Sequence, residues 1–191
     1  MVRVDPPSGP NDRKFRELVV LIARKSEGDK QFGATKLNKL LFYADFLSYL
    51  NFGRSITKHV YQRLRNGPAP RRLLPILDEM ETAGDIVRAD RQYYGKTQKV
   101  VLAKREPDTS CFTSRELSLI NDVIQDFWNM NATQMSEKSH QFRGWQLAED
   151  KEEIPYQMAL VQFVKPTKKD RARFEERADE LSRLAKDCLG E

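Results

Sequence analysis

The segment Ala34–Gly53, ATKLNKLLFYADFLSYLNFG, constrains the fold more than any other part of the chain. Leu37, Leu40 and other aliphatic residues recur at three- and four-residue spacing, and aromatic residues make most of the remaining helical surface apolar too. A helix that is apolar on nearly every side needs cover on every side, so we predict that it lies at the centre of the domain. Thr35 is expected to cap its start, and Gly53 to end it by adopting a positive φ.

Further helices are predicted on both sides of this segment from apolar periodicity and from start signals. Thr113–Glu116 forms a capping box, and Asn131 with Gln134 three residues later gives a second start signal. The first helix is expected to begin with Asn11 or Asp12 as its cap. The predicted helices cover about residues 11–27, 72–83, 114–127, 132–140, 155–164 and 167–189.

Two short strands are predicted at Ile86–Ala89 and Lys99–Ala103, joined by a polar loop over residues 90–98. The segment Ile56–Leu64 fits either a short strand or an irregular helical turn, because periodicity does not separate them. The predicted fold class is α+β and predominantly α-helical: a central apolar helix, a small antiparallel β-hairpin in a winged-helix-like middle, and a long charged C-terminal helix. We expect a disordered arm over residues 1–10, one domain over 11–165 and the charged helix over 166–191.

Composition narrows the class of protein. The chain has 191 residues, with 33 Lys and Arg against 28 Asp and Glu, a net charge of +5 and a pI near 9.2. This excess suits an acidic partner, although both signs are interspersed and most charges are expected to solvate the surface. Cys111 and Cys188 are the only cysteines, and no apolar run approaches the ~20 residues of a membrane helix. We therefore expect a soluble protein of the reducing cytoplasm that is not bound to a membrane.

No catalytic chemistry is predicted. His59 and His140 lie in different elements, and neither stands in a recognisable nucleophile or metal-binding pattern. The sequence also lacks the glycine-rich patterns that bind nucleotides. We expect no catalytic residue, cofactor or metal, and we interpret both histidines as structural, with His140 holding the chain before Trp145.

The stretch RNGPAPRRLL, residues 65–74, has two readings. In the first it is only a stiff turn that leads into a helix starting near Arg72, which leaves Pro75 in the first turn. In the second, Arg65, Arg71 and Arg72 cluster at the positive end of that helix and bind an anion. The acids that follow at residues 78, 79, 81 and 85 would repel DNA, so an acidic protein partner is ranked above nucleic acid.

The order of several motifs resembles the Panacea domain of the SocA-like antitoxin family. The motifs are LNKLLFYADF, FGRSIT, a tyrosine, NGPAP, a leucine-rich helix and AGDI, followed by CFTSREL, Ser-His at residues 139–140, Trp145 and EIPY. The resemblance covers about residues 15–164 and implies a mainly helical protein that neutralises a toxin by direct binding in the cytoplasm, without enzymatic activity. One member of the family passes its toxin to an ATP-dependent protease. Lys58 stands where the family pattern implies a glycine.

The leading hypothesis is therefore an antitoxin that binds a cognate protein toxin. A winged-helix-like DNA-binding regulator and an adaptor that delivers the toxin to an ATP-dependent protease remain as alternatives. The final helix is expected either to mediate self-association into a homo-oligomer or to dock on its own domain. The predicted partner-binding residues are Lys58, Tyr61, Arg65, Arg71, Arg72, Trp145 and Tyr156.

Overall fold

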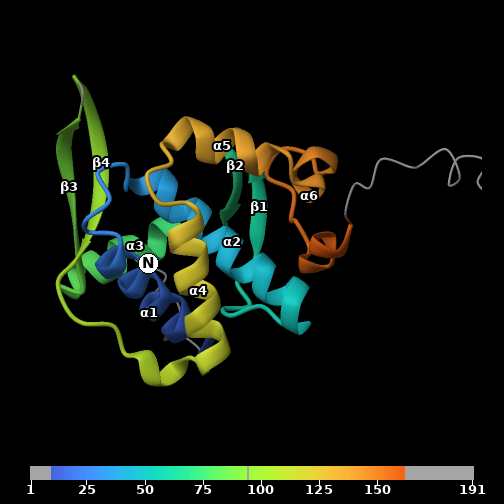
Figure 1. The fold of residues 1–191 in the computed structure, drawn as a ribbon, viewed down its shortest axis with the longest axis horizontal. Helices are drawn as coiled ribbons and strands as arrows, with labels where there is room; N and C mark the ends of the chain where they lie inside the picture. The colour runs from blue at the N-terminus through green and yellow to red at the C-terminus, as the bar shows by residue number, and fades with distance from the viewer. Residues whose placement is uncertain (1–9, 94, 162–191) are drawn as a thin grey trace, which may run out of the picture. The chain divides into compact units, whose positions relative to one another are not determined.

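The computed structural model describes residues 10–93 and 95–161. Within them the chain forms six α-helices, two antiparallel β-hairpins and two short 3-10 helices (Figure 1). The elements are α1 (Pro10–Lys25), α2 (Ala34–Phe52), β1 (Tyr61–Leu64), β2 (Gly67–Pro70), α3 (Leu73–Thr82), β3 (Ile86–Tyr93), β4 (Lys96–Ala103), η1 (Thr109–Cys111), α4 (Ser114–Asp126), α5 (Ala132–His140), α6 (Arg143–Leu147) and η2 (Tyr156–Leu160). The expected N-terminal arm, except Pro10, and the expected final helix lie outside the described residues.

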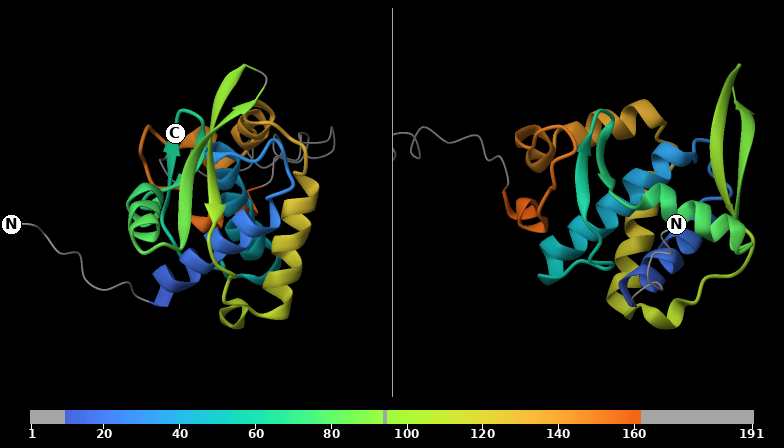
Figure 2. Two further views of the ribbon diagram at one scale, coloured as in Figure 1. Left: turned by 90° about the vertical axis from the view of Figure 1, so that its left-hand side faces the viewer. Right: turned by 180° about the vertical axis from the view of Figure 1, so that it is seen from behind.

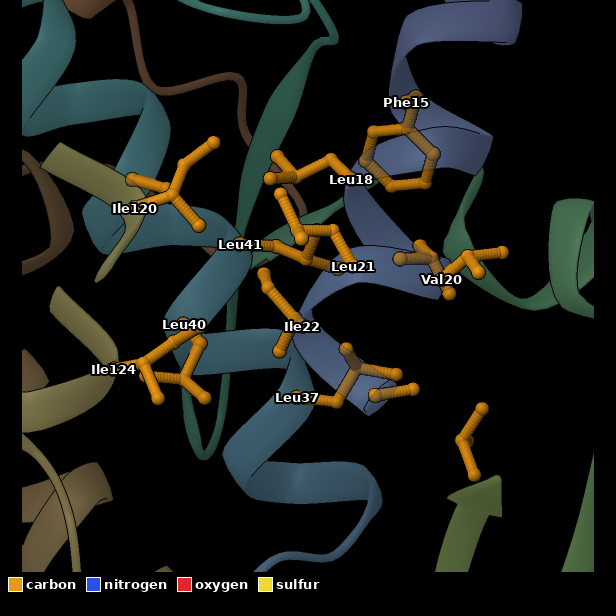
Figure 3. Close-up of a cluster of buried hydrophobic side chains, with 14 of the residues drawn as sticks. Phe15, Leu18, Val20, Leu21, Ile22, Leu37, Leu40, Leu41, Ile120 and Ile124 are labelled. Atoms are coloured by element: carbon orange, nitrogen blue, oxygen red, sulfur yellow. The ribbon is translucent and has the colours of Figure 1, made fainter. Parts of the chain in front are cut away.

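Helix α2 is central, as predicted. It contacts α1, α4, α5, β2, β4 and η2. Its aliphatic residues meet those of α1 and α4 in one core, in which Leu40 and Leu41 are fully buried (Figure 3). Gly53 ends the helix with a φ of +69° and donates its N–H to Tyr49 O. The Thr35 cap is wrong: Gly33 is the N-cap, without a side-chain hydrogen bond, and Thr35 lies inside the first turn.

The predicted caps of the other helices have mixed outcomes. The capping boxes at Thr113 and Asn131 are both present. Helix α1 begins at Pro10, so Asn11 and Asp12 lie within its first turn and neither precedes it as a cap. The carboxylate of Asp12 instead lies 3.1 Å from His59 Nε2 and accepts a hydrogen bond from Arg72 at 3.2 Å.

The stretch NGPAP forms one strand of the first hairpin. Strand β2 pairs with β1 from Tyr61↔Pro70 to Leu64↔Gly67, which shows that Ile56–Leu64 ends in a strand. All four residues of β2 are buried, against α2 and α5. Helix α3 begins at Leu73, so Pro75 lies in its first turn as predicted. The stiff extended segment was predicted, but its burial was not.

The second hairpin is longer than predicted. Strands β3 and β4 pair along their full lengths, so residues 90–93 and 96–98, expected in a loop, belong to strands. Their polar side chains find partners that are distant in sequence: Arg91 donates to Phe32 O at 2.8 Å and Gln98 to Gln31 O at 3.1 Å. The far end of this hairpin extends away from the helices (Figure 2).

Two predictions for the last third of the chain are wrong in detail. Trp145, which falls between the predicted helices over 132–140 and 155–164, lies in the short helix α6. Pro155 precedes the 3-10 helix η2, which occupies the described part of the segment expected to be an α-helix over residues 155–164. Both elements are too short to show helical periodicity, which is why the sequence pattern did not separate them.

Gly67 allows us to test how tightly β2 is packed. Its φ is +104°, and an added Cβ would lie 2.2 Å from Ser139 Oγ and 2.7 Å from Lys39 Nζ. We expect Gly67→Ala to lower the free energy of unfolding, measured in urea, by about 3 kcal/mol or more, from backbone strain plus overpacking. Gly84→Ala is the matched control, since Gly84 also has a positive φ, of +80°, but nothing within 4 Å of the added atom. It should cost about 1–2 kcal/mol, and equal losses in the two variants would contradict the packing argument.

Candidate partner-binding site

The two charged residues of the LNKLLFYADF motif, Lys39 and Asp45, are buried, and so is Lys36 just before it. Lys39 on α2 has no exposed surface, and its Nζ donates to Pro68 O at 3.1 Å. Burial lowers the pKa of Lys39 to about 7. Lys36, also on α2, bonds to Asp29 at 2.5 Å and to Met130 O at 2.9 Å. These lysines therefore connect α2 to other chain segments and do not reach the surface.

Asp45, also on α2, is hydrogen-bonded to the Ser-Ile-Thr segment and to β1. Its carboxylate accepts from Thr57 N at 2.8 Å and from the Thr57 hydroxyl, and the Tyr61 hydroxyl lies 2.8 Å from Oδ2. Burial raises the pKa of Asp45 above its ordinary range, although the hydrogen bonds from Thr57 and Tyr61 oppose that shift. The motif of α2 thus holds the Ser-Ile-Thr segment and strand β1 in place.

Two of the predicted partner-binding residues belong to this buried network. Tyr61 is 1% exposed, and its hydroxyl also lies 3.0 Å from Leu41 O. Tyr156 is half-buried; its hydroxyl donates to His59 O at 2.7 Å and lies 3.5 Å from Asp45 Oδ2. The structure therefore places the Tyr61 side chain in the core and the Tyr156 hydroxyl in its polar network.

Trp145 covers the turn end of the first hairpin. Its Nε1 donates to Leu64 O at 2.8 Å, and its ring is stacked on that of His140 with the centroids 4.0 Å apart. The guanidinium of Arg63 lies 4.8 Å from the ring centroid. His140 thus contacts the Trp145 ring directly. His59 is buried and stacks on Phe15.

The predicted arginines are divided between the two ends of this hairpin. Arg65 is exposed in the turn between β1 and β2, whereas Arg71 and Arg72 follow the other end of β2. Arg71 N donates to Val60 O at 2.9 Å, so exposed Val60 lies beside Arg71, and exposed Lys58 is two residues before Val60 in the chain. We call the group Lys58, Val60, Arg71 and Arg72 the arginine surface.

Acidic side chains partly neutralise the arginine surface. Arg72 lies 3.2 Å from Asp12 and 3.9 Å from Glu79, and Arg71 lies 3.9 Å from Glu153. The two arginine side chains are 45% and 46% exposed. Exposed pairs of this kind contribute about 0–1 kcal/mol each, so a partner's carboxylates can replace them at little cost. Of the predicted cluster, only Arg71 and Arg72 lie at the start of α3, and acids that are distant in sequence accompany them; Arg65 lies at the other end of the hairpin.

A groove beside α3 was not predicted. It has a volume of about 450 Å³ and lies between α3, the start of α2 and the second hairpin. Leu74 lines it and is 68% exposed. The groove, called here the α3–hairpin groove, is lined by Ala34, Leu74, Leu77, Arg88, Ala89, Asp90, Lys99, Val100 and Val101. The only sequence signal was Leu74, which falls beside the buried stripe of α3.

Ion pairs fix the walls of this groove. Arg88 on β3 contacts Asp78 at 2.7 Å and Glu81 at 2.6 Å, both on α3. The Glu81 carboxylate also accepts from Arg88 N at 2.7 Å. These contacts hold the base of the hairpin against the helix, so the groove is formed before any partner binds.

The family model for the SocA-like antitoxin, Panacea domain, matches residues 37–146, which is more than half of the chain. The chain belongs to this antitoxin family. No curated protein and no solved structure matches it. The matched range includes Lys39, Asp45 and nearly all of the α3–hairpin groove, but not Tyr156.

Two further findings concern only the described residues. Among residues 10–93 and 95–161, no group of three or more His, Cys, Asp or Glu side chains is arranged to hold a metal ion. In the same part of the chain, none of the helices combines the length and the apolar character needed to cross a membrane.

The lowered pKa of Lys39 predicts how stability changes with pH. The folded protein releases this proton near pH 7, whereas the unfolded chain keeps it to about pH 10.4. Because the unfolded state then binds more protons, this group makes the free energy of unfolding rise from about pH 7 to pH 9.5, by at most ~1.4 kcal/mol per pH unit. Urea unfolding of wild type and Lys39→Met should show this rise only in wild type; parallel profiles would contradict it.

Lys58 carries a measurable backbone cost. Its φ is +58°, a conformation that glycine adopts more easily, and the family pattern implied a glycine at this position. We expect Lys58→Gly to raise the free energy of unfolding by about 0.5 kcal/mol, the strain relieved exceeding the entropy lost. Thermal unfolding measures this change, with Lys58→Ala as the control that keeps the strain. A glycine variant no more stable than the alanine variant would contradict the prediction.

Proposed function

We propose that this protein neutralises a cognate protein toxin by binding it directly, without catalysis, through the arginine surface and the adjoining start of α3. Membership of the antitoxin family supports a toxin as partner. The position of Leu74 is the observation that supports this choice of surface. Leu74 is strongly exposed and follows the two exposed arginines, and the helix to which it belongs is buried on its other side. Exposed apolar and arginine side chains together are typical of protein interfaces.

The surface is preorganised by the residues beneath it. Leu73, Ile76 and Leu77 anchor α3 in the core, and Pro75 restricts the backbone of its first turn. Strand β2, which leads into Arg71, is held from below by Lys39. Little conformational entropy is then lost when a partner binds, which favours a tight complex. A complex of this kind would inhibit the toxin by covering its active or substrate-binding surface.

The alternative of a DNA-binding regulator has less support. Helix α3 is followed by a hairpin, as in a winged helix, but it exposes Asp78 and Glu79 beside the arginines. These carboxylates would repel a duplex that followed the helix. DNA binding predicts an affinity that falls steeply with salt, by ~10³-fold between 50 and 200 mM for 6 to 10 phosphate contacts. A flat or absent response to salt would reject this alternative.

An adaptor is separated from a simple inhibitor by proteolysis. In that hypothesis the arm or the final helix contacts an ATP-dependent protease, and both segments lie outside the described residues. Faster degradation of the toxin when this protein and the protease are both present would support delivery. Complex formation with unchanged degradation would support inhibition by binding.

Light scattering of the protein alone tests the expected homo-oligomer.

The direct test is co-expression with the product of the adjacent gene. We expect that product to be toxic alone, and to be harmless and copurified when this protein is present. Arg71→Gln with Arg72→Gln should weaken the complex about tenfold or more in calorimetry, because both charge-assisted contacts are lost. The same change should lower the free energy of unfolding by less than ~2 kcal/mol, since only exposed pairs break.

Arg65→Gln is the control for this variant, because Arg65 is also exposed but lies at the other end of the hairpin. It should leave the affinity unchanged. A harmless adjacent product, or two proteins that do not copurify, would contradict the proposed function. Equal losses from the Arg65 and the Arg71/Arg72 variants would contradict the proposed surface.

A further inference from the structure

We propose that the α3–hairpin groove receives an apolar side chain from an acidic segment of the toxin. This inference rests on the proposed function and adds the chemistry of the partner. The groove lies immediately beside the arginine surface, because Leu74 at its edge is two residues from Arg72. A partner seated on the arginines therefore reaches the groove without crossing other elements.

The size and lining of the groove suit an apolar anchor. Its volume of about 450 Å³ falls within the range of ligand-binding clefts, ~300–1,000 Å³, and exceeds what one side chain fills. Leu74 and Leu77 form one side, and Ala89, Val100 and Val101 come from the hairpin. Leu74 keeps 68% of its surface in water, and a partner residue that covered it would gain hydrophobic free energy. Central apolar anchors of this kind carry much of the affinity of protein interfaces.

The charges around the groove indicate an acidic partner. Arg71 and Arg72 precede Leu74, and their acidic neighbours on this chain form ion pairs that a partner's carboxylates can replace. Exposed Lys99 lies on the opposite wall. The acids on the α3 side, Asp78 and Glu81, are already engaged by Arg88. Asp90 is the register partner of Lys99 and offsets part of that charge. A segment with carboxylates near its apolar anchor would thus meet two arginines on one side and a lysine on the other.

The same charges disfavour a second copy of this chain as occupant. In a symmetric dimer whose axis passes near the groove edge, Arg71 and Arg72 would lie near the same arginines of the other copy. Like charges placed opposite one another cost free energy, whereas a toxin segment with carboxylates relieves the positive charge. The groove therefore fits a complementary partner better than self-association.

Two pairs of variants test the anchor and the charge separately. Leu74→Asp and Leu74→Lys both remove the apolar contact, but only aspartate adds a charge that repels an acidic segment. Leu147→Asp and Leu147→Lys are the controls, because Leu147 is 65% exposed and lies on α6, outside the groove. The probe is the purified product of the adjacent gene, and binding is measured by calorimetry at low and at physiological salt.

We expect Leu74→Asp to weaken binding by about a hundredfold and Leu74→Lys by about tenfold, with both Leu147 variants within about twofold of wild type. The difference in binding affinity between Leu74→Asp and Leu74→Lys should become smaller as the salt concentration rises, because this difference arises from charge. All four variants should keep the wild-type melting temperature within a few degrees, since both leucines are exposed.

Each of the remaining outcomes would contradict one specific claim. Wild-type affinity in both Leu74 variants would overturn the groove as binding site while leaving the proposed function intact. A loss in Leu74→Lys equal to or larger than that in Leu74→Asp would overturn the acidic partner. A change of oligomeric state in the Leu74 variants alone, seen by light scattering without toxin, would assign the groove to self-association and overturn the inference. Failure of wild-type protein to bind the product would instead contradict the proposed function.

Discussion

Two buried ionisable side chains of α2, Lys39 and Asp45, determine how the rest of the domain is arranged. A charge or polar group removed from water costs several kcal/mol unless it is hydrogen-bonded, and the partners of both residues lie in other segments of the chain. Lys39 is satisfied only when Pro68 of β2 lies beside it, and Asp45 only when the Thr57 segment and Tyr61 are in place. An alternative packing of the first hairpin would leave these groups unpaired, so they specify one arrangement.

The surface that we assign to the toxin depends on that arrangement. Strand β2 leads directly into Arg71 and Arg72, and these into α3, whose buried side packs in the core. Helix α3 then turns at Gly84 into the second hairpin, and Arg88 ties the two together. The motifs of α2 and β2 thus build the scaffold, while Arg71 and Arg72 lie between NGPAP and the leucine-rich helix, and most of the hairpin follows AGDI.

Local signals predicted the parts of the fold that depend on local structure. The apolar surface of α2, the capping boxes at Thr113 and Asn131 and the place of Pro75 all follow from residues a few positions apart. The full length of β3 and β4 was missed because their outer halves are polar and are held by carbonyl groups of residues 30–32, far away in sequence. Tyr61 and Tyr156 were named as candidate partner-binding residues for a similar reason. A tyrosine that binds a buried carboxylate looks the same in sequence as one that meets a partner.

The candidate site was predicted in part, for the same physical reason. The clustering of Arg71 and Arg72 was visible, but the acids that accompany them come from α1, α3 and residue 153. The α3–hairpin groove was not visible, since three separate segments form it. Amide hydrogen exchange, with and without the product of the adjacent gene, tests the whole account most directly. We expect slower exchange in the complex at residues 71–77, 88–90 and 99–101, with α6 and the turn at Arg65 unchanged; protection confined to α6 and that turn would contradict it.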